Sequence, residues 1–167
     1  MKKVVMTPNP YRDRDFSCVL EAQRILSAAG VEAKICLAFE VDKSFALPQG
    51  VPLFDLQEEL RTADALICFG GDGTILHTSK AAARCGIPIL GVNIGTVGFM
   101  AELESGEMGL LSRLATDDYQ IDERMTLEKK LSDARYALDT VTSKLKASQT
   151  EADELRRQVA ELKNDDF

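Results

Sequence analysis

The sequence lacks the features that direct a chain to a membrane, to the cell exterior or to nucleic acid. No apolar run approaches the ~20 residues that a transmembrane helix needs, and the apolar stretch behind the two N-terminal lysines is too short for a signal peptide. The net charge of −7 argues against nucleic acid, because phosphate backbones are bound through basic surfaces. We therefore expect a cytoplasmic protein with neither a membrane nor nucleic acid as a partner.

Cysteine is scarce and is not arranged in metal-binding pairs. The four cysteines, Cys18, Cys36, Cys68 and Cys85, are widely spaced, and no CxxC pair occurs. A metal site or a disulfide remains an alternative, but buried cysteine commonly behaves as a small hydrophobic residue. We predict reduced and mostly buried thiols, and we assign no metal-ligating residue.

Glycine and proline are absent from the C-terminal part of the chain. All 11 glycines and all five prolines lie at or before Gly109, whereas 20 of the 46 residues in 122–167 are charged. This change in composition predicts two domains. Residues 1–123 form a nucleotide-binding α/β domain, and residues 124–167 form a long helical tail.

The first domain alternates short apolar runs with helical patterns. Strands are predicted at 2–7, 31–39, 64–70 and 87–93, and helices at 15–30, 56–63, 74–86 and 105–115. Strands and helices that alternate at this spacing are typical of parallel βαβ units with right-handed crossovers. The predicted fold is therefore α/β, with a doubly wound, mostly parallel, Rossmann-like sheet.

Three glycines surround one aspartate in "GGDGT", residues 70–74, between a predicted strand and a helix expected to start near Thr74. Doubly wound sheets bind ligands beyond the carboxyl ends of their strands. Backbone N–H groups and a helix N-terminus at this position suit phosphate. A carboxylate repels phosphate, so Asp72 either takes part in chemistry or helps to position Mg²⁺. An ordinary tight turn with Asp72 as a helix cap is the alternative.

A second loop bracketed by glycines, "GVNIGTVGFMAEL" at residues 91–103, follows the next predicted strand. Together, "GGDGTILH" and "GVNIGTVGFMAE" resemble the NAD kinase family, and a weaker similarity extends from the first strand to residues 119–127. "GGDGT" alone is shared with lipid kinases and phosphofructokinase-like enzymes. The resemblance implies transfer of the ATP γ-phosphoryl group to the 2′-hydroxyl of the adenosine ribose of NAD, with Mg²⁺ as cofactor.

The resemblance also assigns the site residues. Asp72 matches the family's catalytic aspartate, which acts as the base for the attacking hydroxyl. Phe99 matches an aromatic that lines the dinucleotide pocket, with core packing as the alternative, and Asn93 either lies beside that pocket or stabilises a turn. His77 is the single histidine, and it either contacts NAD or has no ligand role. The complete predicted nucleotide-binding set is Gly70, Gly71, Asp72, Gly73, Thr74, His77, Asn93 and Phe99.

The tail has a heptad pattern. From Leu127 to Leu162, apolar or small residues recur at alternating spacings of four and three, which predicts a long helix of coiled-coil character. In a parallel pair, Lys130 would face Arg135 and repel it, while Glu151 would face Arg156 and attract it. The charges therefore do not select an orientation. A homo-oligomer through residues 127–163 is one interpretation, and packing on the α/β domain or on a different partner is the other.

The tail stands where the NAD kinase family has a second, β-rich domain that supplies much of the NAD site. Residues 119–127 alternate like the strand that leads into that domain, and the pattern then changes to heptads. Two hypotheses follow. The chain is an NAD kinase-like phosphotransferase, or it is a catalytically incomplete nucleotide-binding domain whose tail serves oligomerisation or partner binding. We expect little or no turnover from this chain alone, with weak nucleotide binding retained.

Overall fold

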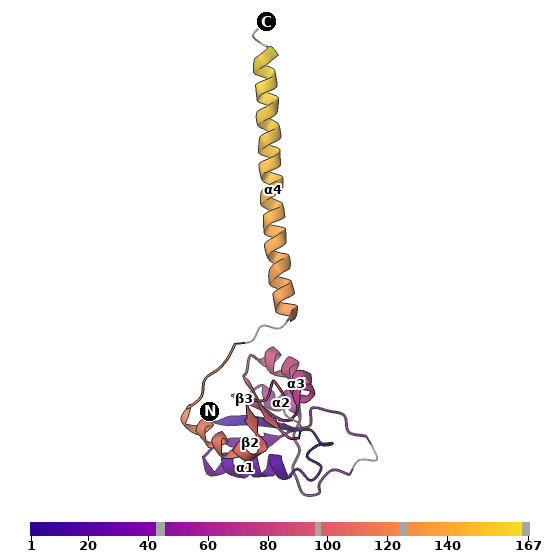
Figure 1. Cartoon of the computed structure of the whole chain (residues 1–167), viewed down its shortest axis with the longest axis vertical. Coiled ribbons are helices and arrows are strands. Elements are labelled where there is room, and N and C mark those ends of the chain that lie inside the picture. The colour runs from indigo at the N-terminus through magenta and orange to yellow at the C-terminus, as the bar shows by residue number, and fades with distance from the viewer. Residues whose placement is uncertain (43–45, 96–97, 124–126, 165–167) are drawn as a thin grey trace. The chain divides into compact units, whose positions relative to one another are not determined.

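The computed structural model describes residues 1–42, 46–95, 98–123 and 127–164, with side chains of the last segment described over 134–157 (Figure 1). The chain divides into two compact units, Met1–Ile121 and Asp122–Phe167. The division falls two residues before the boundary expected from composition. None of the described helices is long and apolar enough to cross a membrane.

A five-stranded parallel sheet forms the centre of the first unit. Its strands are β1 (Lys3–Pro8), β2 (Glu32–Ile35), β3 (Ala65–Gly70), β4 (Ile89–Asn93) and β5 (Leu103–Glu104), in the order β2-β1-β3-β4-β5. The predicted doubly wound α/β fold is thus confirmed. The strand predicted at 31–39 ends earlier, at Ile35, and the short β5 was not predicted. Strand-like alternation was noted at residues 119–127. Of these, 119–123 form neither helix nor strand, 124–126 lie outside the described residues, and Leu127 begins a helix.

Helices cover both faces of this sheet because its strands are apolar on both sides. Helix α1 (Ser17–Ala28) and the 3-10 helix η1 (Ser105–Thr116) pack on the face that carries Met6, Ile67 and Phe69. Helices α2 (Leu56–Leu60) and α3 (Asp72–Cys85) pack on the opposite face, against Val5, Leu66 and Cys68. Successive residues of β1 and β3 therefore enter two separate core layers, as the period of two in a strand requires.

The start of α1 depends on a buried carboxylate just beyond the end of β1. Asp13 is only 2% exposed, and its carboxylate accepts hydrogen bonds from the backbone N–H groups of Cys18 and Val19 at 3.1 and 3.0 Å. These groups have no carbonyl partner within the first turn of a helix, so the carboxylate satisfies them. The loop after β1 is thereby attached to α1, and this fixes the path of the residues between them.

The second unit contains the helix α4 (Leu127–Asn164), which is 38 residues long. All of its described side chains, at 134–157, are exposed. Side-chain hydrogen bonds in this range join residues three or four positions apart, and in one of them the Thr140 hydroxyl donates to the Tyr136 carbonyl oxygen. The long helix is present as predicted, while its coiled-coil character remains a prediction.

Candidate functional site

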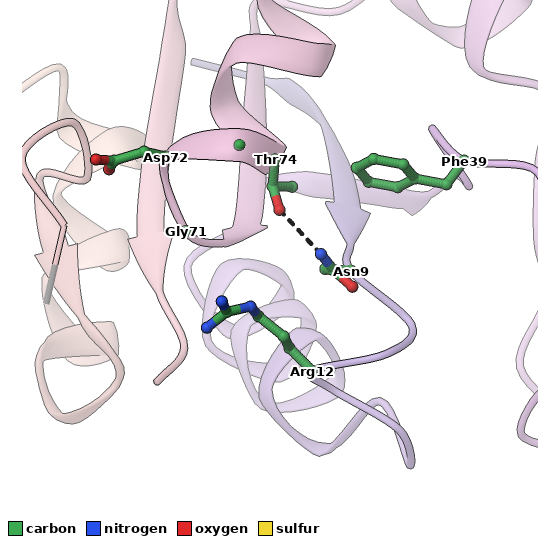
Figure 2. Close-up of a pocket in the computed structure, with 7 residues that line it drawn as sticks. Asn9, Arg12, Phe39, Gly71, Asp72 and Thr74 are labelled. Atoms are coloured by element: carbon green, nitrogen blue, oxygen red, sulfur yellow. Dashed lines mark hydrogen bonds between the residues drawn. The ribbon is translucent and has the colours of Figure 1, made fainter. Parts of the chain in front are cut away.

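The candidate site lies between β1 and β3, where the order in which the chain adds strands to the sheet reverses. From β1 the chain passes first to β2 on one side and later to β3 on the other side. Ligands of open α/β sheets bind outside the carboxyl ends of the strands at such a switch point. A pocket of about 200 Å³ lies at this position and is lined by Asn9, Arg12, Phe39, Gly71, Asp72, Gly73 and Thr74 (Figure 2).

The glycine turn forms one wall of this pocket. Gly70 ends β3, Gly71 caps α3 in an extended conformation, and Gly73 lies in the first turn of the helix. The helix starts at Asp72, two residues earlier than expected, because the N–H groups of Thr74 and Ile75 both bond to the Gly71 carbonyl at 2.9 and 3.2 Å. Three of the predicted residues, Gly71, Asp72 and Gly73, therefore bring the positive end of a helix directly to the pocket.

Thr74 connects the two loops that surround the pocket. Its hydroxyl accepts a hydrogen bond of 3.1 Å from the Asn9 side-chain amide, and its side chain is almost fully buried (Figure 2). The side-chain oxygen of Asn9, Oδ1, in turn accepts a hydrogen bond from the backbone N–H of Tyr11. The loop after β1 and the start of α3 are thus fixed to each other. This arrangement makes Thr74 a residue that shapes the pocket.

Asp72 connects the glycine turn to the second glycine loop. Its two carboxylate oxygens accept hydrogen bonds from the backbone N–H groups of Phe99 and Met100, both at 3.1 Å. Gly98 makes this possible, because a Cβ atom there would overlap with the Asp72 carboxylate. Figure 2 shows the carboxylate pointing away from Asn9 and Thr74. The glycine turn and the second glycine loop, residues 91–103, therefore meet at Asp72.

Arg12 supplies the positive charge of the pocket and was not among the predicted site residues. Its guanidinium donates to the carbonyl oxygen of Ile94 at 3.2 Å. Gly95 has a φ of +122°, and a Cβ atom there would lie 2.7 Å from Arg12 Nη1, so a larger residue would crowd the guanidinium. The sequence signal was the arginine-containing loop "YRDRD", residues 11–15, which follows the strand predicted at 2–7 after three residues. The order of the strands, which the sequence did not predict, brings this loop to the same edge of the sheet as the glycine turn.

His77 lies outside the pocket lining. Its Nε2 atom is 2.9 Å from the carbonyl oxygen of Ala38, and its ring stacks on Phe39 with a centroid separation of 4.5 Å. Phe39 was also absent from the sequence prediction, and it provides the aromatic side of the pocket. The structure thus places His77 behind Phe39, where it holds the loop after β2 against α3.

Phe99 and Asn93 occupy very different environments. The Phe99 side chain is fully exposed and does not line the pocket, because the contact with Asp72 is made by its backbone. Asn93 is 1% exposed, and its side-chain amide donates to both carboxylate oxygens of Glu104 at 3.2 and 3.0 Å. Its Oδ1 atom is buried and has no hydrogen-bond partner within the described part of the chain. Asn93 therefore joins the ends of β4 and β5.

The cysteines are free thiols, and two of the four are buried. Burial raises the pKa of Cys36 to about 12, and the nearby Glu59 carboxylate adds to this effect. Burial likewise raises the pKa of Cys68. Cys85 is exposed and Cys18 is half-buried, so the prediction of mostly buried thiols fits two residues.

Within the described ranges, no cluster of three or more histidine, cysteine, aspartate or glutamate side chains could hold a metal ion. Mg²⁺ in nucleotide sites usually keeps several waters and binds through one or two carboxylates together with the phosphates of the substrate. Asp72 is the carboxylate that the pocket offers. Because both oxygens of Asp72 already accept backbone N–H groups, a Mg²⁺ ion here would be held mainly through the phosphates of a nucleotide.

Comparison with known proteins identifies relatives of the α/β unit. Residues 52–119 match the model of the ATP-NAD kinase N-terminal domain, which includes the glycine turn and the loop of residues 91–103. The chain is related to the NAD kinases. The resemblance derived from the two motifs is thereby confirmed, and the matched range ends before α4.

Two curated NAD kinases illustrate the similarity. The enzyme of Heliobacterium modesticaldum is 40% identical over 97 residues, which cover 51% of this chain and 34% of that protein. The enzyme of Natranaerobius thermophilus is 32% identical over 144 residues, which cover 86% of this chain and 49% of that protein. The chain thus spans between a third and a half of the length of these relatives.

A solved structure supports the fold. The crystal structure of yeast NADH kinase complexed with NADH superposes with a TM-score of 0.50 and 19% sequence identity. The match covers 70% of this chain and 36% of the yeast chain. At this level of identity the likeness concerns the fold of the α/β unit.

Proposed function

We propose that the α/β unit is the phosphate-binding part of an NAD kinase-like phosphotransferase. The reaction is transfer of the γ-phosphoryl group of ATP to the 2′-hydroxyl of the adenosine ribose of NAD, giving NADP. The observation that carries this proposal is the position of Asp72, which lies at the start of α3 and is bonded to the loop of residues 98–100 beside a pocket that contains Arg12.

In this proposal, the phosphates of ATP bind to the start of α3 and to Arg12. The first N–H groups of a helix are free to donate to an anion, and the helix dipole favours negative charge there. Arg12 adds a full positive charge opposite the same turn. Because phosphoryl transfer depends on positioning and charge neutralisation, these groups supply what the reaction needs from this side of the site. A Mg²⁺ ion held by the phosphates of the nucleotide would neutralise further charge.

Asp72 is proposed as the group that accepts the proton of the 2′-hydroxyl. A carboxylate has about four lone-pair sites, and two of them are used by the N–H groups of Phe99 and Met100. The remaining sites can accept a hydrogen bond from a ribose hydroxyl. The two backbone donors keep the carboxylate in one orientation, which is the pre-organisation that a base requires.

A second candidate is a nucleotide-binding unit that does not turn over by itself. It is favoured by the exposure of Phe99 and by the open side of the glycine turn, where a Cβ atom on Gly73 would meet no other atom within 4 Å. Holding two reactants in the correct relative position lowers the activation free energy by ~7–11 kcal/mol, and an open site that does not hold NAD loses this contribution. We therefore propose that this chain alone binds ATP weakly and forms little or no NADP.

Two measurements test these proposals. Calorimetric titration with MgATP should show binding that Arg12→Ala weakens about 10- to 100-fold, because a hydrogen bond to a charged group contributes ~1.5–3 kcal/mol. Arg14→Ala is the matched control, because Arg14 is also exposed in the same loop but does not line the pocket. Equal losses in both variants would show that only the overall charge matters and would remove Arg12 from the phosphate site.

The second measurement is formation of NADP from NAD and MgATP by the intact chain and by Asp72→Asn. Any turnover should disappear in Asp72→Asn, while ATP binding remains within about threefold, a difference of ~0.7 kcal/mol. Turnover that survives this change would exclude Asp72 as the base. Turnover of the intact chain at a rate typical of enzymes, about 1–10³ s⁻¹, would contradict the incomplete-site proposal.

A further inference from the structure

Helix α4 exposes apolar side chains that have no role in the proposed chemistry. Leu138, Val141, Leu145 and Leu155 are 65, 62, 57 and 55% exposed. Their spacing places them along one stripe of the helix, together with the small residues Ala134, Ser148 and Ala152. We call these seven residues the α4 seam. Leaving an apolar seam of this length in water is unfavourable, so the seam favours contact with another apolar surface.

A parallel, in-register pair would place each seam residue opposite the same residue of the second helix. Ala134 would face Ala134, Ser148 would face Ser148, and Ala152 would face Ala152. Small residues opposite each other leave unfilled space, and unfilled space in a core lowers stability. The middle of a parallel pair would therefore be poorly packed.

An antiparallel pair can combine these residues differently. If Leu145 lies level with Ser148 of a second copy, then Val141 meets Ala152 of that copy, and Leu138 meets its Leu155. Each of the two middle layers then combines a large side chain with a small one, and the outer layer combines two leucines. Alternation of large and small residues across facing positions is how a core reaches native packing density.

The flanking charges also fit this register. Lys144 comes beside Glu151 of the second copy, and the symmetric contact repeats it, whereas in a parallel pair Lys144 would flank the neutral Gln149. Among the described side chains, Arg135 beside Arg156 of the second copy is the unfavourable contact, and Arg156 already bonds to Asp153 of its own helix at 3.1 Å.

We propose that α4 pairs antiparallel with α4 of a second copy of this chain, with Leu145 and Ser148 at its centre. With 38 residues and a rise of 1.5 Å per residue, the N-terminal ends of the two helices lie ~57 Å apart. Each α/β unit is joined to one of these ends. The pairing therefore links two nucleotide pockets into one particle without merging them, whether or not the pockets catalyse phosphoryl transfer.

Disulfide trapping of the intact chain tests the orientation. Leu138→Cys and Leu155→Cys are made separately, each with Cys85→Ser because Cys85 is exposed. Oxidation of the two variants mixed should give a covalent dimer, because the two cysteines share a layer. Each variant alone should give no covalent dimer, because the introduced cysteines of the two copies lie ~25 Å apart along the helix axis. Cross-linking of each variant alone, together with the absence of a disulfide between positions 138 and 155 in the mixture, would show a parallel pair and overturn the proposal.

Sedimentation of the unmodified chain supplies the mass, which should be twice the 18.3 kDa of one chain. A monomer would mean that α4 packs on its own α/β unit or awaits a different partner, and would also overturn the proposal. Lys144→Glu should weaken the pair about fivefold at low salt, and adding Glu151→Lys should restore it, because exposed pairs contribute ~0.2–1 kcal/mol each. No effect of Lys144→Glu, as a parallel pair requires, would contradict the antiparallel register.

Discussion

The two units of this chain differ in what makes them stable. In the α/β unit, three consecutive residues of β1, Val4, Val5 and Met6, are fully buried between helices on both faces of the sheet. In α4, every described side chain is exposed, and Leu138 keeps 65% of its surface in water. The first unit can be stable through its own core. Within residues 134–157, whose side chains are described, the second unit shows local helical interactions only, and such interactions are marginal for an isolated helix.

This difference also separates the two kinds of function. The α/β unit builds a site from residues distant in the sequence, because Asn9 and Thr74 meet at one edge of the sheet. A single helix offers a continuous stripe and suits association with another helix. Variants that remove the same kind of side chain from each unit therefore test whether the two units behave independently.

The largest effect is expected for truncation of the sheet core. Ile67→Ala removes a fully buried side chain from the central strand β3 and should lower the free energy of unfolding by ~2–5 kcal/mol. Leu145→Ala removes a side chain that is 57% exposed in α4, and it should leave the unfolding of the α/β unit unchanged. Chemical denaturation followed by the fluorescence of bound dye or by far-UV circular dichroism measures both variants.

Leu145→Ala is expected to act elsewhere, on the concentration dependence of the helical signal, because Leu145 lies at the centre of the proposed pair. A loss of α/β stability in Leu145→Ala as large as that in Ile67→Ala would show that α4 packs on the α/β unit. The two units would then not be independent.

The sequence predicted what depends on local pattern. The alternation of apolar runs with helical segments predicted four of the five strands. The glycine turn was recognised because Gly70, Asp72 and Thr74 lie within five consecutive residues. Arg12 and Phe39 were missed because only the order of the strands brings their loops to the turn. The short β5 was missed because two residues carry no periodic signal.

The residues assigned by resemblance show a different limit. The prediction that Phe99 lines a pocket rests on its side chain, yet the structure uses its backbone N–H and leaves the ring in water. His77 was considered for a ligand contact, and it instead bonds to the carbonyl of Ala38. A motif specifies where the chain passes, but the direction of each side chain depends on neighbours that the motif does not include.

An intermediate effect is expected for the contact between the two glycine motifs. In Gly98→Ala, the added methyl group would overlap with the Asp72 carboxylate and would displace it from the N–H groups of Phe99 and Met100. Leaving such groups without partners should lower the free energy of unfolding by ~1–3 kcal/mol. Gly106→Ala is the matched control, because a Cβ atom there meets no atom within 4 Å.

Thermal unfolding of the two glycine variants provides the comparison. Gly98→Ala should unfold at a lower temperature than Gly106→Ala, and it should also lose any NADP formation if Asp72 is the base. Equal stability of the two variants would show that the contact between Asp72 and the second loop contributes nothing to the fold.

The smallest effect is expected within α4 itself. Ala147 is exposed and lies outside the α4 seam, so Ala147→Gly changes the helix backbone without changing the proposed contact surface. Glycine in a helix interior costs ~0.8–1 kcal/mol relative to alanine. The helical signal of the tail should therefore melt at a lower temperature, while the unfolding of the α/β unit stays the same.

Circular dichroism during heating follows the tail, and protection of the β1 and β3 amides from hydrogen exchange follows the sheet. A shared decrease in both signals would mean that the helix and the sheet unfold as one cooperative unit, contrary to the independence that their different burial predicts.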